Sequence, residues 1–462
     1  MIGLVMSFAF PELKEFRKRR IYQIMTDRFA GMNQSSCIDL NSYCGGDFKG
    51  IRSKLDYIQN LGYNAIWISP TVEQVSNSIS AYHGYWFSNF YGTNPHFGSE
   101  QDLKDLINEA HKRDIFVIAD VVYNHVGSCP GGSQDFSCVV TFPLPEYYHP
   151  DCYIYDWNND TLVQNCRLYG LPDLDQDHPF VRQQLLNWAQ WYQQQFNFDG
   201  FRIDTVKHID HKFWKDLRKV TPWFNIGEIY DGSYTYLRQF TNQEEVHSTF
   251  NYPLFFAISN AIGNSQSMYQ LSNTFSESVL VFEDDVYDLG VFFENHDNPR
   301  FLAAHNDIKK YENALALIHT WVGIPVLYYG QEQDLVGGFD SENRQALWLF
   351  GYDQNANHYQ FIKQLNDIRC KIPFDQLDQK ELYVSDNFYS YSRGNRVMVA
   401  LTNAGKGSSQ IFYNVENSPF SANTKICDIF SKECINVNID GSVDIYLNQG
   451  QTKVYIMESD MI

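Results

Sequence analysis

Residues 179–204 read PFVRQQLLNWAQWYQQQFNFDGFRID, and the two elements in this stretch decide the fold of the chain. Pro179 follows Asp177-His178, and a proline after such residues is typical of a helix start. The apolar spacing that follows indicates an amphipathic helix up to Phe196. Gly200–Asp204 is then a short β-rich run that ends on a carboxylate. A helix followed by such a strand is the repeating unit of a parallel α/β sheet.

The same alternation of strand and helix recurs over the first three-quarters of the chain. The β-rich runs are Ile21–Met25, Ala65–Ser69, Phe116–Val122, Gly200–Asp204, Phe224–Glu228, a weaker Thr249–Phe256, Gly290–Glu294 and Ile324–Tyr329. Helix-like segments such as Gly98–Arg113 and Lys309–Val322 lie between them. Eight units over roughly 370 residues fit a (β/α)8 TIM barrel with insertions better than an open doubly wound sheet. The glycine pattern of a dinucleotide-binding open sheet is absent after the first strand.

Two further regions interrupt and follow the predicted barrel. About fifty residues rich in Gly, Pro, Tyr and Cys come after the third strand. So long a stretch in a compact protein usually has a function. We therefore predict a small irregular domain at 126–178, inserted between barrel segments 1–125 and 179–377. The helical pattern then stops, and alternating segments predict an antiparallel β-sandwich at 378–462. These segments are Tyr383–Ser392, Arg396–Asn403, Ser409–Tyr413 and Thr452–Met457.

The charge balance limits the partners of the chain. It carries 55 acidic and 35 basic residues among 462, a formal charge of −20. Nucleic acid and anionic membranes both require a basic surface, which argues against either as a partner. A neutral polymer or a hard cation is compatible with this charge. No apolar run has the length of a membrane span, and the apolar Met1–Phe10 lacks the features of a complete signal peptide. Nothing indicates an obligate oligomer, so we expect a monomer.

Eight of the nine cysteines form close pairs in turn-rich, polar surroundings. The pairs are Cys37/Cys44, Cys129/Cys138, Cys152/Cys166 and Cys427/Cys434. None has the CxxC spacing of a zinc site, so we predict four local disulfides and an oxidising, extracytosolic location. The ninth, Cys370, lies in a helical stretch and is expected to be a free, buried thiol. Asn33 and Asn159 begin sequons that a secretory pathway could glycosylate.

The predicted strands end in polar side chains. The third to fifth and the seventh end in Asp120-Val-Val-Tyr-Asn124-His125, Arg202-Ile-Asp204, Gly227-Glu228 and Glu294-Asn-His296-Asp297. Barrel enzymes build their active sites at the carboxyl ends of the strands, so Asp204, Glu228 and Asp297 should converge. Three carboxylates on one rim repel one another, and a protein without a use for them should avoid the arrangement.

Cleavage of a glycosidic bond requires two carboxyl groups of this kind. One acts as nucleophile or base, and the other protonates the leaving oxygen. Arg202 lies two residues before Asp204 on a strand, hence on the same face, where its charge would keep Asp204 ionised for nucleophilic attack. Glu228 would then serve as the acid and afterwards as the base.

These motifs resemble the signature regions of the α-amylase family of glycoside hydrolases. Four of them are DVVYNH at 120–125, GFRIDTVKH at 200–208, GEIYD at 227–231 and FFENHD at 292–297. LPDLD at 171–175 resembles a fifth region, found in the domain inserted after the third strand. YHGYW at 82–86 and YGQEQ at 329–333 are similar to segments of secreted fungal α-amylases. The resemblance covers essentially the whole chain.

The resemblance implies a retaining double displacement on α-glucans such as starch or glycogen. Asp204 would be the nucleophile, Glu228 the general acid/base, and Asp297 the group that binds sugar hydroxyls in the cleavage subsite. The substrate-binding positions that match the family, or lie in its motifs, are Tyr85, Trp86, His125, Arg202, Lys207, His208, His296, Asp340 and Arg344. Lys207-His208 together with LPDLD resembles endo-acting α-amylases, which cleave internal α-1,4 bonds.

A Ca²⁺ ion is the second implication of the resemblance. The ion would bridge the inserted domain and the barrel through oxygen ligands. Asn124 and Asp173 match the family's calcium-binding side chains, and the His208 carbonyl matches a main-chain ligand. Gln164 stands where the family has a Glu, and a main-chain carbonyl ligand would be indifferent to that change.

Two alternatives remain open from the sequence. An exo-acting α-glucosidase or a transglycosylase could use the same scaffold and the same carboxylates. A non-catalytic glucan-binding protein is the alternative from a different class, and all three carboxylates argue against it.

Overall fold

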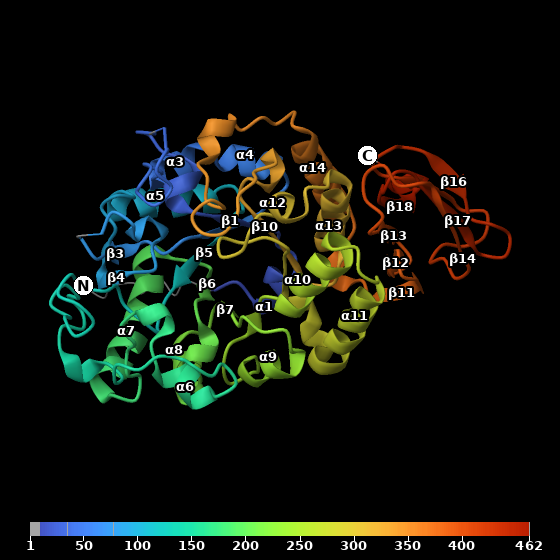
Figure 1. Ribbon diagram of the computed structural model, residues 1–462. Coiled ribbons are helices and arrows are strands. Elements are labelled where there is room, and N and C mark those ends of the chain that lie inside the picture. The colour runs from blue at the N-terminus through green and yellow to red at the C-terminus, as the bar shows by residue number, and fades with distance from the viewer. Residues whose placement is uncertain (1–9, 35, 77, 462) are drawn as a thin grey trace, which may run out of the picture.

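The computed structural model describes residues 10–34, 36–76 and 78–461. Eight parallel strands form a nearly closed barrel in the order β8-β7-β6-β5-β2-β1-β10-β9 (Figure 1). Their bounds are β1 Ile21–Ile24, β2 Ala65–Ile68, β5 Phe116–Val121, β6 Gly200–Ile203, β7 Phe224–Gly227, β8 Ser248–Thr249, β9 Gly290–Val291 and β10 Ile324–Tyr328. A parallel bridge between Phe250 and Gly290 joins the two end strands. The predicted TIM barrel is confirmed.

Helices surround this barrel (Figure 1). Their bounds are α1 Leu13–Phe16, α2 Thr26–Phe29, α3 Phe48–Ser53, α4 Leu55–Asn60, α5 Glu100–His111, α7 Pro179–Phe196, α8 His211–Val220, α9 Tyr234–Phe240, α10 Tyr252–Ile258, α11 Tyr269–Phe282, α12 Phe301–His305, α13 Ile308–Thr320 and α14 Asn357–Lys371. The α7 helix begins at Pro179, as predicted, and the side chain of His178 caps it. Ser99 and Asp102 form a reciprocal capping box at the start of α5, which fixes that helix start.

The prediction of a strand over Thr249–Phe256 is wrong for most of its length. β8 ends at Thr249, and α10 begins at Tyr252. The side chain of Asn251 accepts a hydrogen bond from the Leu254 amide, and Pro253 lies in the first turn. Both features start helices, and they outweigh the apolar content that made this run read as a strand. Likewise, β9 ends at Val291, three residues before the predicted end of its run.

Side chains alternate between the two faces of each barrel strand, and this alternation positions the polar groups. Ile118 and Ile226 belong to the apolar cluster of the barrel interior. Asp120 lies two residues later in β5, and Glu228 lies two residues later, directly after β7, so both face the same way. Arg202 pairs in register with Asp120 on the neighbouring strand. The barrel interior is thus apolar along the middle of the strands and polar at their carboxyl ends.

The region between β5 and α7 is mostly irregular, as predicted. It contains α6 (Asp160–Asn165) and two short 3₁₀ turns, η2 (Pro145–Tyr147) and η3 (Leu168–Gly170). Isolated bridges fasten it to the barrel, one of them between His125 and Asp173. A smaller hairpin of β3 (Val72–Gln74) and β4 (Phe87–Thr93) follows β2.

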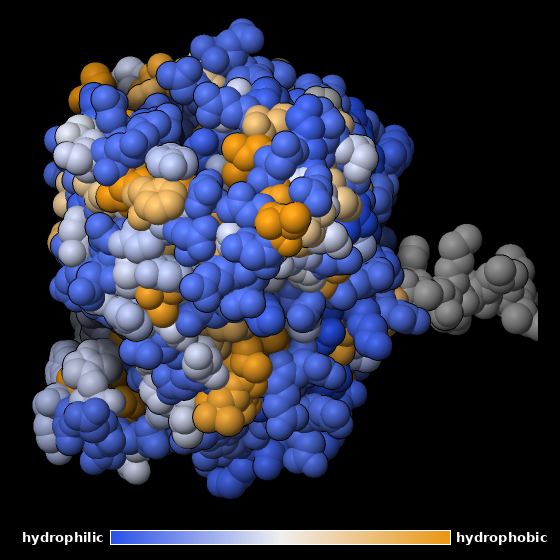
Figure 2. Space-filling model, turned by 90° about the vertical axis from the view of Figure 1, so that its right-hand side faces the viewer, coloured by the Kyte–Doolittle hydropathy of each residue, from blue (hydrophilic) through white to orange (hydrophobic). Residues whose placement is uncertain are grey.

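The C-terminal region forms a six-stranded antiparallel sheet and a two-stranded one packed around an apolar core. The strands are β11 Gln379–Val384, β12 Phe388–Arg393, β13 Val397–Thr402, β14 Ile411–Val415, β15 Lys425–Asp428, β16 Cys434–Asn436, β17 Val443–Leu447 and β18 Lys453–Met457. The predicted segment Tyr383–Ser392 is two strands, because the chain turns at residues 385–387. Figure 2 faces this side of the molecule and shows apolar residues in separate patches on a mainly polar surface.

All four predicted disulfides are present, namely Cys37–Cys44, Cys129–Cys138, Cys152–Cys166 and Cys427–Cys434. Cys370 is free, but the prediction that it is buried is wrong. It is exposed, since it lies in the last turn of α14 on the face that turns away from the core.

Among the described residues, no helix is both long and apolar enough to cross a bilayer. Met1–Phe10 falls, except for its last residue, outside the described part of the chain.

Candidate active site

One buried arginine organises the carboxyl ends of the strands. The Arg202 guanidinium lies 2.7 Å from Asp204 Oδ1 and 2.9 Å from Asp120 Oδ1 through Nη1. Its Nη2 lies 3.0 Å from Glu228 Oε2. The two carboxylates expected to perform chemistry therefore share one cation, which holds them close together. Glu228 also accepts a hydrogen bond from the Thr205 amide at 3.1 Å.

Asp120 belongs to this cluster, and sequence reasoning did not include it among the site residues. It accepts hydrogen bonds from Trp67 Nε1 at 2.9 Å and from the Tyr85 hydroxyl at 2.7 Å. Asp120 is the first residue of the DVVYNH motif and lies on an inward-facing strand position. The alternation that paired Arg202 with Asp204 would have found it.

The charge state of the cluster differs from the expectation that Arg202 alone keeps Asp204 ionised. Burial raises the pKa of Asp204 well above the usual value, although the Arg202 charge opposes this, and Glu228 and Asp120 raise it further. Burial likewise raises the pKa of Asp120 to about 6. The physical reason is that burial removes water from both carboxyl groups, and the charge of Arg202 offsets this only in part. Asp204 and Asp120 therefore hold their protons to a higher pH than solvated carboxyl groups would.

Asp297 and its neighbour His296 lie beside this cluster. His296 is buried, and its Nδ1 lies 2.8 Å from Gln23 Nε2, while its Nε2 lies 3.3 Å from Asp297 Oδ2. Burial lowers the pKa of His296 well below the usual value, so the ring is neutral. The Tyr85 ring stacks on it, with ring centres 5.2 Å apart and planes 9° apart. This stack forms one wall of the site.

These residues open onto a single cavity of about 300 Å³. Its lining includes nine of the predicted site residues, namely Tyr85, Trp86, His125, Asp204, Glu228, His296, Asp297, Asp340 and Arg344. The structure adds His83, Leu168, Tyr169, Leu171 and Thr205. Sequence reasoning missed these five, although Leu171 begins the LPDLD motif and the exposed Tyr169 lies two residues before it.

Three predicted substrate-binding residues do not line the cavity. Arg202 lies beneath it, fully buried under the carboxylates. Lys207 donates a hydrogen bond to the Tyr230 carbonyl at 2.8 Å. The Nδ1 atom of His208 lies 3.0 Å from the Val163 carbonyl oxygen, which ties the barrel to α6. His125 does face the cavity, and its buried Nε2 has no hydrogen-bond partner among the described residues.

Asp340 and Arg344 form the far side of the cavity and are held from behind. Arg344 lies 2.8 Å from Asp340 and 3.3 Å from Asp297. Its main-chain carbonyl accepts a hydrogen bond of 3.0 Å from Arg28, which also stacks over the Tyr82 ring at 3.9 Å. The Tyr82 hydroxyl in turn lies within hydrogen-bond distance of both Asp340 and Arg344.

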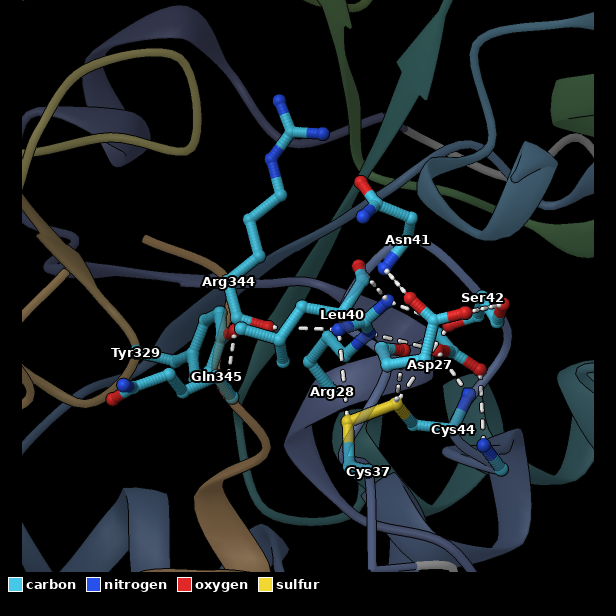
Figure 3. Close-up of a disulfide and its surroundings, with 12 residues drawn as sticks. Asp27, Arg28, Cys37, Leu40, Asn41, Ser42, Cys44, Tyr329, Arg344 and Gln345 are labelled. Atoms are coloured by element: carbon cyan, nitrogen blue, oxygen red, sulfur yellow. Dashed lines mark hydrogen bonds and ion pairs between the residues drawn. A yellow bond between two sulfur atoms is a disulfide. The ribbon is translucent and has the colours of Figure 1, made fainter. Parts of the chain in front are cut away.

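A disulfide loop fixes Arg28 in this position, as Figure 3 shows. The carbonyl oxygens of Leu40 and Ser42, inside the Cys37–Cys44 loop, accept hydrogen bonds from Arg28 Nη2 at 2.9 and 2.8 Å. The carboxylate of Asp27 lies 2.8 Å from Arg28 Nε and accepts the Cys44 amide. A contiguous chain of contacts thus connects the disulfide to Arg344.

Oxygen atoms suited to a hard cation meet where the inserted domain joins the barrel. Asn124 and Asp173 are brought together by the bridge beside them, and the Leu174 amide donates to the Asn124 carbonyl at 2.8 Å. Asn124 Oδ1 is buried and has no partner among the described residues. Burial raises the pKa of Asp173 to about 7, and the His149 side chain at 2.7 Å only partly opposes this.

The two main-chain candidates, Gln164 and His208, lie on elements that pack against each other. Gln164 follows Val163 on α6, and α6 packs against η4 (Val206–His208). His208 is close enough to His125 for a positive charge on His125 to lower its pKa. Asn124 Oδ1 lacks a hydrogen-bond partner among the described residues, and the charge of the Asp173 carboxylate is only partly balanced by His149. Both groups therefore suit a hard divalent cation.

Comparison with known proteins agrees with this geometry. A family model described as the α-amylase catalytic domain matches residues 23–374, and one described as α-amylase domain C matches residues 381–462. α-Amylase 1 of Schwanniomyces occidentalis is 35% identical, covering 96% of this chain and 90% of its own length.

Solved structures share the whole architecture. An α-amylase from Malbranchea cinnamomea superposes with a TM-score of 0.92 at 34% identity, covering 97% of this chain and 98% of that one. An α-amylase from Geobacillus thermoleovorans, solved in complex with acarbose, gives a TM-score of 0.84 at 31% identity over 95% of this chain and 98% of that one. The two family models together span nearly the whole chain, and the chain belongs to the α-amylase family of glycoside hydrolases.

Proposed function

We propose that this protein is an endo-acting α-amylase that hydrolyses internal α-1,4 bonds of starch, glycogen and related glucans. The observation that carries the proposal is the cavity lined by Asp204, Glu228 and Asp297 above a shared Arg202. Two carboxylates on one guanidinium fit the short separation of the retaining mechanism, about 5 Å. Relatives of similar length are named α-amylases, and one was solved with acarbose.

The reaction begins with attack of Asp204 on the anomeric carbon of the sugar in the cleavage subsite. The carboxylate oxygen forms a bond to that carbon while the bond to the leaving oxygen breaks, and Glu228 gives its proton to that oxygen. Glu228, now a carboxylate, removes a proton from water, whose oxygen attacks the same carbon and releases Asp204. This cycle requires an ionised Asp204 and a protonated Glu228 at its start.

The remaining groups position the sugar and stabilise its positive charge. Asp297 accepts hydrogen bonds from ring hydroxyls, and its charge favours the oxocarbenium-like transition state. Neutral His296 and the unpartnered Nε2 of His125 offer further hydrogen bonds to hydroxyl groups. The Tyr85 ring gives an apolar face on which the sugar can stack. Arg344 and Asp340 bind a neighbouring glucose unit.

We also propose that a Ca²⁺ ion binds where the inserted domain meets the barrel. Asn124 Oδ1 and Asp173 would hold it with the carbonyl oxygens of Gln164 and His208. When bound, the ion supplies positive charge to Asp173 and fastens the inserted domain, which lines one side of the cavity, to the barrel. The unpartnered Asn124 oxygen supports this assignment.

Secretion is the location that best fits the cysteine chemistry. Four disulfides persist in oxidising compartments and are rare in the cytosol. Asn159 is exposed, so its sequon could be glycosylated, whereas Ser35 of the Asn33 sequon lies outside the described residues. Recovery of the protein from culture medium, with a mass decrease after glycosidase treatment, would support both proposals.

The test of function compares wild type with Glu228→Gln on soluble starch and on a maltooligosaccharide blocked at its non-reducing end. We expect the variant to lose on the order of 10²–10⁴-fold in rate, because it cannot donate the proton. Glu277→Gln, on the exposed surface of α11, makes the same chemical change outside the site and should retain activity.

The outcomes separate the alternatives. Rapid loss of iodine staining with few new reducing ends, together with cleavage of the blocked substrate, would support the endo-acting assignment. Release of glucose or maltose without cleavage of the blocked substrate would indicate an exo-acting enzyme. A folded wild type without activity would leave glucan binding as the function.

A further inference from the structure

A second cavity, with a volume of about 530 Å³, lies at the opposite end of the barrel from the carboxylates. Arg20 and Asn64 line it and directly precede β1 and β2, so it borders the amino ends of these strands. Its other wall is formed by residues 369–376, at the end of α14 and the turn that follows. None of the residues proposed for glucan cleavage lines it.

The lining of this cavity is basic, although the protein as a whole is acidic. Its charged residues are Arg17, Lys18, Arg20, Arg369, Lys371 and Asp375. Five of these six are cationic, while the chain carries a formal charge of −20. Such a concentration of positive charge is unfavourable without a compensating anion, because like charges repel and burial removes their water.

Only two of the five cations have a carboxylate partner among the described residues. Arg17 lies 2.6 Å from Asp288, and Lys18 lies 2.7 Å from Glu15. No ion pair involves Arg20, Arg369 or Lys371 within the described chain. Three unpaired cations therefore border one cavity.

Arg369 is one of these unpaired cations, and only 9% of its surface is exposed. One of its nitrogens, Nη1, donates a hydrogen bond of 2.8 Å to the His319 carbonyl, and its guanidinium lies over the Phe374 ring. Burial lowers its pKa, and the charges of Arg393 and Arg20 lower it further. The guanidinium has further N–H donors beside the cavity without a partner among the described residues.

Arg20 repeats this arrangement on the opposite wall. It is 8% exposed, and its Nε donates to the Gly62 carbonyl at 2.5 Å. Its two terminal nitrogens have no hydrogen-bond partner among the described residues. Burial is also the largest influence on Arg20, and it lowers the pKa. Two buried guanidinium groups thus border the same space with unused donors.

We propose that this cavity binds a phosphate-type oxyanion, held by the guanidinium groups of Arg20 and Arg369 and the ammonium group of Lys371. Guanidinium donors form a planar fork that matches two oxygens of phosphate at once. The cavity is larger than a free phosphate ion, so it accommodates either inorganic phosphate or the phosphate group of a small phosphate monoester. The site is independent of the glucan site.

Cys370 provides a direct reporter, because it lines the cavity and is the only cysteine outside a disulfide. The first measurement is the rate at which Cys370 reacts with a dianionic aromatic disulfide reagent. The neutral reagent methyl methanethiosulfonate serves for comparison, and Cys370→Ser confirms the site of reaction. Inorganic phosphate and glucose 1-phosphate are each titrated at constant ionic strength set with sodium chloride. No substitution of an arginine is needed, so folding of a variant does not limit this test.

Calorimetry on the intact protein then tests the arginines. We expect saturable phosphate binding by wild type and a decrease of about tenfold or more in affinity for Arg369→Gln, since charge-assisted hydrogen bonds are lost. Lys371→Gln, at an exposed position, should give a smaller decrease. Arg238→Gln removes the same charge from α9, where Arg238 pairs with Asp285, and should bind phosphate as wild type does.

The results divide clearly. Saturable protection of Cys370 by phosphate, and faster reaction with the anionic reagent, support the site. Tighter binding of glucose 1-phosphate than of phosphate would identify a phosphate monoester as the ligand, whereas equal binding would identify free phosphate. If neither compound protects Cys370 beyond the effect of sodium chloride, or if Arg369→Gln binds phosphate as wild type does, the proposal is wrong.

Discussion

Replacing both cysteines of the Cys37–Cys44 disulfide with serine should weaken substrate binding, although neither residue lines the glucan cavity. The loop that they close holds Arg28 through two carbonyl oxygens, and Arg28 donates to the Arg344 carbonyl. Loosening the loop should therefore release Arg344 from its position beside Asp297. We expect a larger effect on KM than on kcat, because Asp204 and Glu228 keep their contacts with Arg202.

The structure allows an estimate of the loss of stability and of the rise in KM. The disulfide spans a sequence separation of 7, and opening a loop of this length costs about 2.4 kcal/mol in the chain-entropy model. Loss of one hydrogen bond that orders Arg344 is worth about 0.5–1.5 kcal/mol, which corresponds to a rise in KM of about two- to twelvefold. The stability effect and the binding effect can therefore be measured separately.

The control is the Cys427–Cys434 disulfide, which also spans a separation of 7 but lies in the C-terminal domain. Its double serine variant should lose comparable stability, and its KM should equal that of wild type. The assay is steady-state hydrolysis of a blocked maltooligosaccharide, together with thermal unfolding of all three proteins. An unchanged KM in the Cys37/Cys44 variant, or an equal rise in both variants, would refute the proposed link to Arg344.

Three further predictions concern the metal, the shared arginine and pH. Excess chelator should lower both the melting temperature and the activity, and Asp173→Asn should weaken Ca²⁺ binding in calorimetry; no shift with chelator would count against the metal site. Arg202→Lys should lower kcat/KM and the melting temperature, because one ammonium group cannot contact three buried carboxylates, which leaves charges unpaired at about 3–5 kcal/mol; wild-type stability of this variant would disprove the shared role. Burial lowers the pKa of His247 to about 3, so the unfolded chain binds a proton below its pKa of about 6.5 that the folded protein excludes. The contribution of His247 to the free energy of unfolding is complete above pH 6.5 and falls by about 2 kcal/mol by pH 5. The melting temperature of His247→Gln should therefore fall less steeply over this range than that of wild type.

Much of the barrel could be predicted from the sequence, because its strands are buried on both sides and read as continuous apolar runs. The run at Phe116–Val122 matches β5 to within one residue, and the helix at Pro179–Phe196 has the observed bounds. The run over Thr249–Phe256 misled because its apolar residues serve a helix whose start depends on Asn251. The helix cap formed by Asn251 outweighed the apolar composition of this run.

The site was predicted less completely, for a physical reason. Asp204 and Glu228 directly follow β6 and β7, and Asp297 lies in the loop after β9, where the barrel rule brings side chains together. The dependence of Arg344 on Arg28 involves residues 316 positions apart in the sequence. Likewise, the effect of burial on Asp204 depends on how three carboxylates pack around one cation, which no spacing rule describes.

The single guanidinium beneath the cavity also limits what substitutions can reveal. Asp120, Asp204 and Glu228 compete for Arg202, so neutralising one of them changes how tightly the other two are held and where the retained proton resides. The titrations of Asp120 and Asp204 then belong to the pair rather than to either residue. The effects of single substitutions at these positions will not add, and double-mutant cycles should show coupling between each pair. The pH profile of Glu228→Gln is therefore that of two carboxyl groups with altered contacts to Arg202, and it cannot be read as the wild-type profile with one group removed.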